Sequence, residues 1–118
     1  MHNAREMAAL AVQALEDKKG QEIKVLKTAD ITSLADYFVI CTANSSTHIK
    51  TLADEVERQL EEQMEERILH REGYRAGGWV LLDYGVVVVH LFMEEAREFY
   101  NLERLWADAE TVDISALL

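Results

Sequence analysis

The sequence predicts a single-domain α/β protein in which helices pack on a mixed β-sheet that includes an antiparallel hairpin. Three observations support this fold class. Apolar residues recur at helical spacing in two segments, aromatic and β-branched residues cluster in one short run, and two further apolar runs flank a glycine. At 118 residues, 49% of them hydrophobic, the chain is long enough for one core and too short for two.

The first half of the chain contains the segments expected to form most of the core. A helix is predicted over residues 4–15, where apolar side chains recur every three or four positions. Residues 23–26 predict a short strand. Residues 37–42 are aromatic and β-branched, which is typical of a buried strand. A second amphipathic helix follows, with its apolar side at Ile49, Leu52, Ala53, Val56, Leu60 and Met64.

The second half predicts a hairpin preceded by a weaker strand. Residues 68–72 are the candidate strand, and residues 79–83 and 86–92 are apolar runs separated by Tyr84-Gly85. We expect the two runs to pair through a two-residue turn in which the glycine supplies a positive φ. With the strands of the first half, this gives a sheet of about five strands.

A helix is predicted over residues 94–106, which carry several apolar side chains available for packing. We assign residues 1–108 to the domain and expect residues 109–118 to form a mobile tail.

Strand alternation divides the hairpin into two faces. One face is wholly apolar and predicts a core: Val80, Leu82, Val87, Val89 and Leu91. The other mixes aliphatic side chains with a tryptophan, a carboxylate and a histidine: Trp79, Leu81, Asp83, Val86, Val88 and His90. We expect the mixed face to meet a partner, although Trp79 could instead pack under a helix of its own chain. The assignment depends on the turn length, because a three-residue turn would reverse one strand.

The charge balance argues against direct binding to nucleic acid. The chain has 12 Lys and Arg against 22 Asp and Glu, a formal net charge of −10 that repels phosphate. It favours a basic protein as the partner. A single cysteine, Cys41, indicates a reducing compartment, and we find neither a signal peptide nor an apolar run long enough for a membrane helix. We therefore expect a cytoplasmic protein.

No catalytic or cofactor chemistry is indicated. Cys41 lies within a predicted buried strand, which favours a structural thiol over a nucleophile. The four histidines are dispersed, so no metal site is predicted, and neither a P-loop nor a G-x-G-x-x-G motif is present. Asp83 lacks a second carboxylate two positions away, which a metal-dependent nucleotidyl transfer site would require. We expect a protein that is not an enzyme and uses no cofactor.

Three segments together resemble the ribosomal silencing factor family, also called the Iojap family. They are residues 33–46 (SLADYFVICTANSS), residues 78–85 (GWVLLDYG) and residues 97–106 (REFYNLERLW). The resemblance extends from the first helix to about Asp108. It implies a fold similar to nucleotidyltransferases without transferase activity, and a factor that represses translation when nutrients are scarce.

The resemblance also implies a partner and a mode of action. Family members bind the large-subunit ribosomal protein numbered fourteen on the face that meets the small subunit, and so block subunit joining by steric exclusion. Members often form homodimers, whose surface would overlap the ribosome-binding surface.

Carried over by position, the residues expected to face the ribosome are Trp79, Leu81, Asp83 and Tyr84, with Val86 beside them. Acidic residues of the last helix would add electrostatic steering: Glu94, Glu95, Glu98 and Glu103. The chain departs from the family pattern at Val86, where an acidic residue is usual, and at Met93, where histidine is frequent. The first departure would weaken charge pairing, strengthen apolar contact or favour self-association, and the sequence leaves these alternatives open.

Two other functions remain to be tested. A nucleotide transferase is suggested by fold analogy alone. A self-associating assembly module is suggested by Val86 and the apolar hairpin.

Overall fold

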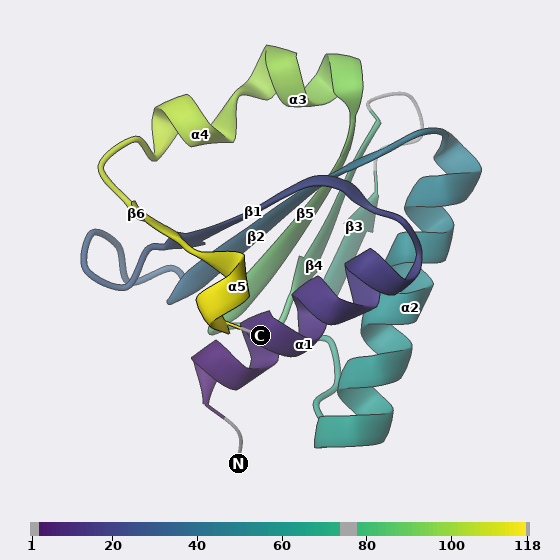
Figure 1. The fold of residues 1–118 in the computed structure, drawn as a ribbon, viewed down its shortest axis with the longest axis horizontal. Coiled ribbons are helices and arrows are strands. Elements are labelled where there is room, and N and C mark those ends of the chain that lie inside the picture. The colour runs from purple at the N-terminus through teal and green to yellow at the C-terminus, as the bar shows by residue number, and fades with distance from the viewer. Residues whose placement is uncertain (1–2, 74–77, 118) are drawn as a thin grey trace.

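A computed structural model describes residues 3–73 and 78–117, and it confirms a single α/β domain built on a mixed sheet. The sheet has six strands in the order β3-β4-β5-β2-β1-β6 (Figure 1). Strand β2 pairs parallel with β5, and the other neighbouring strands pair antiparallel. In chain order the elements are α1 (Ala4–Asp17), β1 (Gln21–Lys27), β2 (Tyr37–Ala43), α2 (Ser46–Met64), β3 (His70–Gly73), β4 (Trp79–Asp83), β5 (Val87–Met93), α3 (Glu94–Tyr100), α4 (Leu102–Leu105), β6 (Glu110–Val112) and α5 (Ile114–Leu117).

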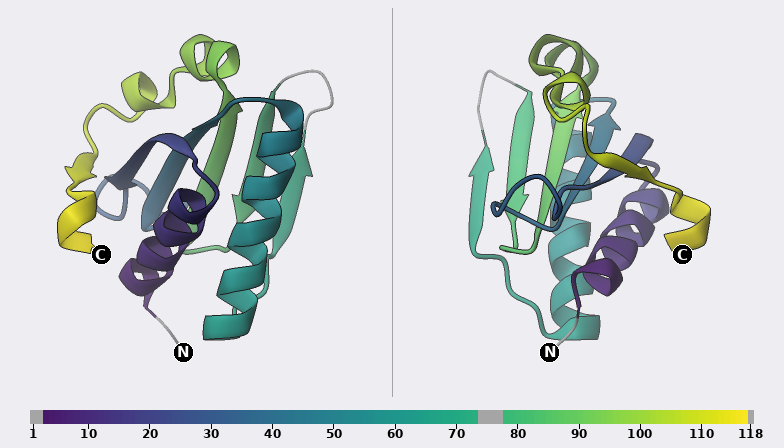
Figure 2. Two further views of the ribbon diagram at one scale, coloured as in Figure 1. Left: turned by 45° about the vertical axis from the view of Figure 1, so that its right-hand side comes forward. Right: turned by 90° about the vertical axis from the view of Figure 1, so that its left-hand side faces the viewer.

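Helices α1 and α2 both cover one face of the sheet (Figures 1 and 2). Each begins at a side-chain cap, because Asn3 accepts a hydrogen bond from the Glu6 N–H and Ser45 accepts one from the His48 N–H. Their apolar stripes meet inward-pointing residues of β1, β2, β4 and β5 in the larger of two cores. Cys41 lies fully buried within this core, and burial raises the pKa of its thiol to about 12. It is therefore a structural thiol.

A smaller core lies on the second face of the sheet, under α3 and α4. Phe38, Phe92 and Leu102 are among its buried members. Arg97 of α3 is buried at its edge, where it donates hydrogen bonds to the Thr42 hydroxyl (2.8 Å) and to the Glu22 carbonyl oxygen (2.5 Å). These bonds hold the start of the C-terminal helical segment against β1 and β2.

The C-terminal region differs from the sequence-based expectation in two ways. The single helix predicted over residues 94–106 is divided at Asn101, whose left-handed backbone (φ 43°) ends α3 and begins α4. The tail expected after Asp108 contains strand β6, which extends the sheet beside β1 and accounts for the sixth strand. Leu117 of α5 is buried in the larger core. The sequence does not predict these contacts, because β6 and α5 are only three and four residues long, too short to show a strand or helix periodicity.

Within the described residues, no helix is long and apolar enough to span a membrane.

Candidate docking surface

The hairpin β4–β5 has a different turn from the one predicted, but its faces are the same. The Tyr84 N–H donates to the Val87 carbonyl (2.9 Å), so the turn consists of Gly85 and Val86 and not Tyr84 and Gly85. Asp83 consequently pairs with Val88, two positions beyond the predicted partner Val86. Because side chains alternate with a period of two, a shift of two positions leaves the side chains within the two strands on their predicted faces. Val86, predicted to begin the second strand, lies in the turn instead.

The second face of the hairpin forms a surface that we call the open sheet face. Trp79, Leu81 and Asp83 of β4 and Val88 of β5 are half-buried there, on the side opposite α1 and α2. Strand β3 extends it, because Glu72 lies beside Leu81 in register and is exposed. Two predicted members remain: His90 is buried beneath the surface, and Val86 lies in the turn, outside both strands. Sequence reasoning missed Glu72 because β3 is short and its pattern is weak.

Trp79 both packs within the chain and contributes to this surface. Its ring stacks on Phe92 with centroids 5.1 Å apart and contacts Tyr100 of α3 at 4.7 Å. Its indole N–H donates to His90 Nδ1 at 3.3 Å. Packing against a helix of its own chain is therefore observed, while contact of the half-buried ring with a partner stays a prediction.

Asp83 and Val86 lie at the end of the hairpin. One carboxylate oxygen of Asp83 accepts a hydrogen bond from the Gly85 N–H (2.7 Å), which fixes the side chain at the turn. Gly85 has φ +84°, a conformation that side-chain-bearing residues rarely adopt. Val86, 41% exposed, projects from the turn and belongs to neither strand. The turn thus displays one carboxylate and one apolar side chain to solvent.

Tyr84 lies in the larger core, apart from the other residues of the motif. Only 6% of it is exposed, and within the described part of the chain its hydroxyl has no hydrogen-bond partner. Burial raises the pKa of this hydroxyl. Alternation explains the position, because Tyr84 continues the core side of β4 after Val80 and Leu82. Its side chain supports the hairpin from below and adds no area to the open sheet face.

The four acidic residues proposed for steering occupy different environments. Glu94, Glu95 and Glu98 are exposed on α3. Glu103 of α4 is committed internally, since its carboxylate accepts from Arg97 (3.3 Å) and lies 3.7 Å from the Lys24 ammonium. Steering of a basic partner can therefore rest on the three α3 carboxylates, while Glu103 neutralises a buried guanidinium.

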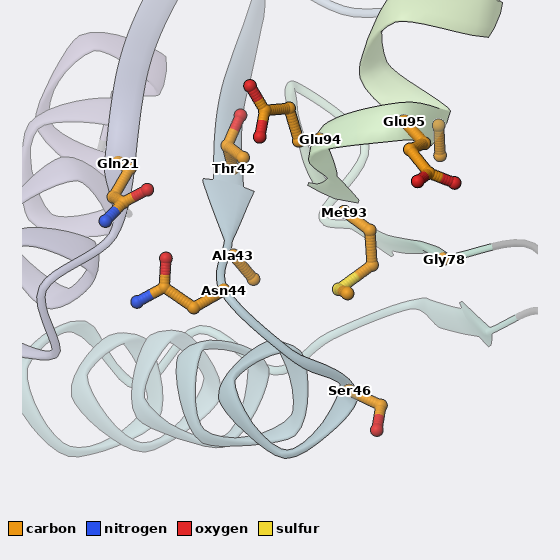
Figure 3. A pocket seen from close by; sticks show the side chains of 10 residues that line it. Gln21, Thr42, Ala43, Asn44, Ser46, Gly78, Met93, Glu94 and Glu95 are labelled. Atoms are coloured by element: carbon orange, nitrogen blue, oxygen red, sulfur yellow. The ribbon is translucent and has the colours of Figure 1, made fainter.

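An open pocket lies where the parallel strands β2 and β5 end, the position at which α/β proteins commonly bind nucleotides (Figure 3). Its polar lining is acidic or uncharged: Glu94 lies beside Thr42, Glu95 lies farther along α3, and Gln21, Asn44 and Ser46 complete it. Two carboxylates repel phosphate. Among the described residues, no group of three or more His, Cys, Asp or Glu could hold a metal ion. The pocket thus gives no support to a nucleotide transferase.

Comparison with known proteins identifies the family. The family model described as "Ribosomal silencing factor during starvation" matches residues 1–118, the whole chain. The chain belongs to the ribosomal silencing factor family. A ribosomal silencing factor of Halalkalibacterium halodurans is 41% identical over 97% of both chains, and one of Bacillus subtilis is 38% identical over 95% of this chain and 94% of its own. The chloroplastic Iojap protein of Zea mays is 29% identical over 91% of this chain and 46% of its own length.

Solved structures support the same assignment. A crystal structure of a protein from Chromobacterium violaceum is similar with a TM-score of 0.85 and 39% identity, over 90% of this chain and 88% of that one. One from Bacillus halodurans is similar with a TM-score of 0.75 and 40% identity, over 88% and 93% of the two chains. The family resemblance seen in the three sequence motifs is therefore confirmed, and the family description indicates a regulatory role.

Proposed function

We propose that the protein binds the large ribosomal subunit through ribosomal protein fourteen and blocks joining with the small subunit by steric exclusion, repressing translation when nutrients are limited. The proposal makes it a cytoplasmic, non-enzymatic regulator that needs no cofactor. The observation that carries it is the open sheet face, a surface of mixed apolar and acidic character in a chain of the ribosomal silencing factor family. The contact residues proposed are Glu72, Trp79, Leu81, Asp83, Val86 and Val88.

The chemistry of this surface suits a basic protein partner. Leu81, Val88 and the exposed part of Trp79 can supply apolar contact, and burying a Trp at an interface contributes on the order of 2 kcal/mol. Glu72 and Asp83 flank these side chains on β3 and β4, where each can pair with a Lys or Arg. The net charge of −10 speeds encounter with a positively charged surface and disfavours contact with ribosomal RNA.

Co-sedimentation with separated ribosomal subunits tests the proposal. The protein should sediment with large subunits and remain in the supernatant with small subunits. Adding it before the subunits are mixed should lower the yield of joined ribosomes. Absence of co-sedimentation with large subunits at near-physiological salt would contradict the proposal.

Trp79→Ala should abolish binding to large subunits. Because Trp79 also packs on Phe92 and Tyr100, its removal is expected to lower the free energy of unfolding as well. Binding must therefore be measured at a temperature where unfolding curves show the variant to be folded. Retained binding by the folded variant would show that the docking surface lies elsewhere.

A homodimer is proposed as a storage form that hides the same surface. Val86 (41% exposed), Phe99 (81%) and Leu105 (70%) are apolar side chains available for self-association. Light scattering across a dilution series should show a dimer that dissociates when large subunits are added. A monomer at every concentration would contradict this storage form and leave the docking proposal untouched.

A further inference from the structure

His90 is a polar side chain in a position where an apolar one would be expected. It lies in the middle of β5, in register with Ile40 of β2 on one side and Leu81 of β4 on the other. It is only 4% exposed. Phe38 contacts its ring edge-on at 4.9 Å, and Phe92 is stacked parallel to it at 6.2 Å. The surroundings of the imidazole are therefore largely aromatic and aliphatic.

Only one of its two ring nitrogens has a hydrogen-bond partner in the described residues. Nδ1 accepts the Trp79 indole N–H at 3.3 Å, whereas Nε2 is buried and unpaired. Because Nδ1 accepts, the proton of the neutral ring is on Nε2. Burial lowers the pKa of His90 to about 4, so the ring is neutral at pH 7 and able to accept. A buried donor without a partner costs folding free energy. Phenylalanine or leucine would fill the site without that cost.

We propose that His90 is a positioning residue for docking. Its Nδ1 accepts a hydrogen bond from the Trp79 indole N–H inside the protein, so a partner that covers Trp79 removes only apolar surface of that ring from water. This inference rests on the proposed function, because it assigns Trp79 to the docking surface. Without an internal acceptor, the indole N–H would lose its water molecules when the partner binds, and the affinity would fall. The same bond restricts the orientation of the ring before docking, which lowers the entropic cost of binding.

Two substitutions separate positioning from a structural role. His90→Phe fills the site with an apolar ring and removes the acceptor. His90→Asn removes the ring but keeps an acceptor oxygen near the position of Nδ1. Phe38→Leu is the matched control, because Phe38 contacts His90 and Trp106 in the same cluster.

Three measurements are made on each variant: the free energy of unfolding, the affinity for isolated large subunits, and solvent exchange of the Trp79 indole N–H by NMR. The indole signal of Trp79 is assigned by loss of the other signal in Trp106→Phe. For His90→Phe we expect unchanged or higher stability, faster indole exchange and an affinity lower by roughly fivefold or more. His90→Asn should recover most of the affinity, and Phe38→Leu should lose stability with little change in affinity.

The inference is overturned if His90→Phe binds large subunits as tightly as the wild type. It is also overturned if the affinity of His90→Phe falls only in proportion to its lost stability and the affinity of His90→Asn is no higher than that of His90→Phe. A wild-type protein that shows a protected Trp79 indole but no affinity for large subunits would instead overturn the proposed function, and the docking role of His90 with it.

Discussion

At the scale of single residues, Asp83 shows how one side chain combines a structural and a proposed binding role. One of its oxygens closes the hairpin turn by accepting from the Gly85 N–H, which leaves the other available to a basic partner. Amide and carboxylate side chains can both accept this bond, but only the carboxylate carries charge. The two roles can therefore be separated by substitution.

Asp83→Asn should leave the free energy of unfolding nearly unchanged and lower affinity for large subunits by about fivefold at low salt. The deficit should shrink as salt rises, because screening weakens the charge pair in the wild type. Asp83→Ala should show the same deficit and also lose about 1 kcal/mol of stability with the turn bond. Equal affinity of Asp83→Asn and the wild type at low salt would remove Asp83 from the contact.

His90 makes a second prediction, on stability and pH. Its pKa is lowered from 6.5 to about 4 by burial, so below pH 6.5 the unfolded chain binds a proton that the folded chain excludes. The free energy of unfolding therefore contains the full contribution of neutral His90 above pH 6.5. It falls by about 3 kcal/mol in total as the pH drops from 6.5 to 4. Urea unfolding of the wild type between pH 7 and pH 4.5 should show this slope.

The matched variant for this titration is His90→Asn, which should be nearly insensitive to pH above 4.5. Below that value carboxylates contribute, since hydrogen bonds from Arg58 and Gln59 lower the pKa of Glu55 to about 2. An equal decline in both proteins between pH 6.5 and 4.5 would assign the effect to another group.

At the scale of elements, the hairpin shows what alternation can and cannot predict. The two faces of β4 and β5 followed from the period of two and are confirmed. The turn was misplaced by one residue, because a glycine suits either position of a two-residue turn. Tyr84 is buried in the larger core and so lies before the turn, which Gly85 and Val86 form; such burial is a tertiary feature that no local pattern reports.

The division of the C-terminal helix at Asn101 gives a third prediction. Asn101 adopts φ 43°, and its side-chain oxygen accepts from the Arg104 N–H at 3.3 Å. Asn101→Ala should lose about 2 kcal/mol of unfolding free energy, because alanine disfavours the left-handed conformation and provides no cap. Asn101→Gly should lose only a few tenths of that amount, since glycine tolerates the conformation.

Chemical denaturation of the two Asn101 variants checks the prediction. If Asn101→Ala were as stable as the wild type, the segment would be a continuous helix, as its sequence alone suggested. The apolar spacing of residues 94–106 continues across Asn101, so periodicity could not reveal the break.

At the scale of the whole molecule, the arrangement of layers explains why one face of the hairpin is available. Helices α1 and α2 cover the same side of the sheet, while α3 and α4 cover the other side only in part (Figure 2). The sequence predicted both helices and their apolar stripes. It could not predict that they share a face, because this depends on the parallel pairing of β2 with β5 across a long connection.

Docking through the open sheet face is tested most directly by a subunit-joining assay, followed by light scattering, with two charge-matched variants. Leu81→Arg places a positive charge on the open sheet face, and Thr51→Arg places the same charge on the exposed side of α2, across the sheet. We expect the wild type and Thr51→Arg to block joining equally, whereas Leu81→Arg, shown to be folded, should not block it. Equal inhibition by both variants, or stronger loss with Thr51→Arg, would contradict docking through the open sheet face.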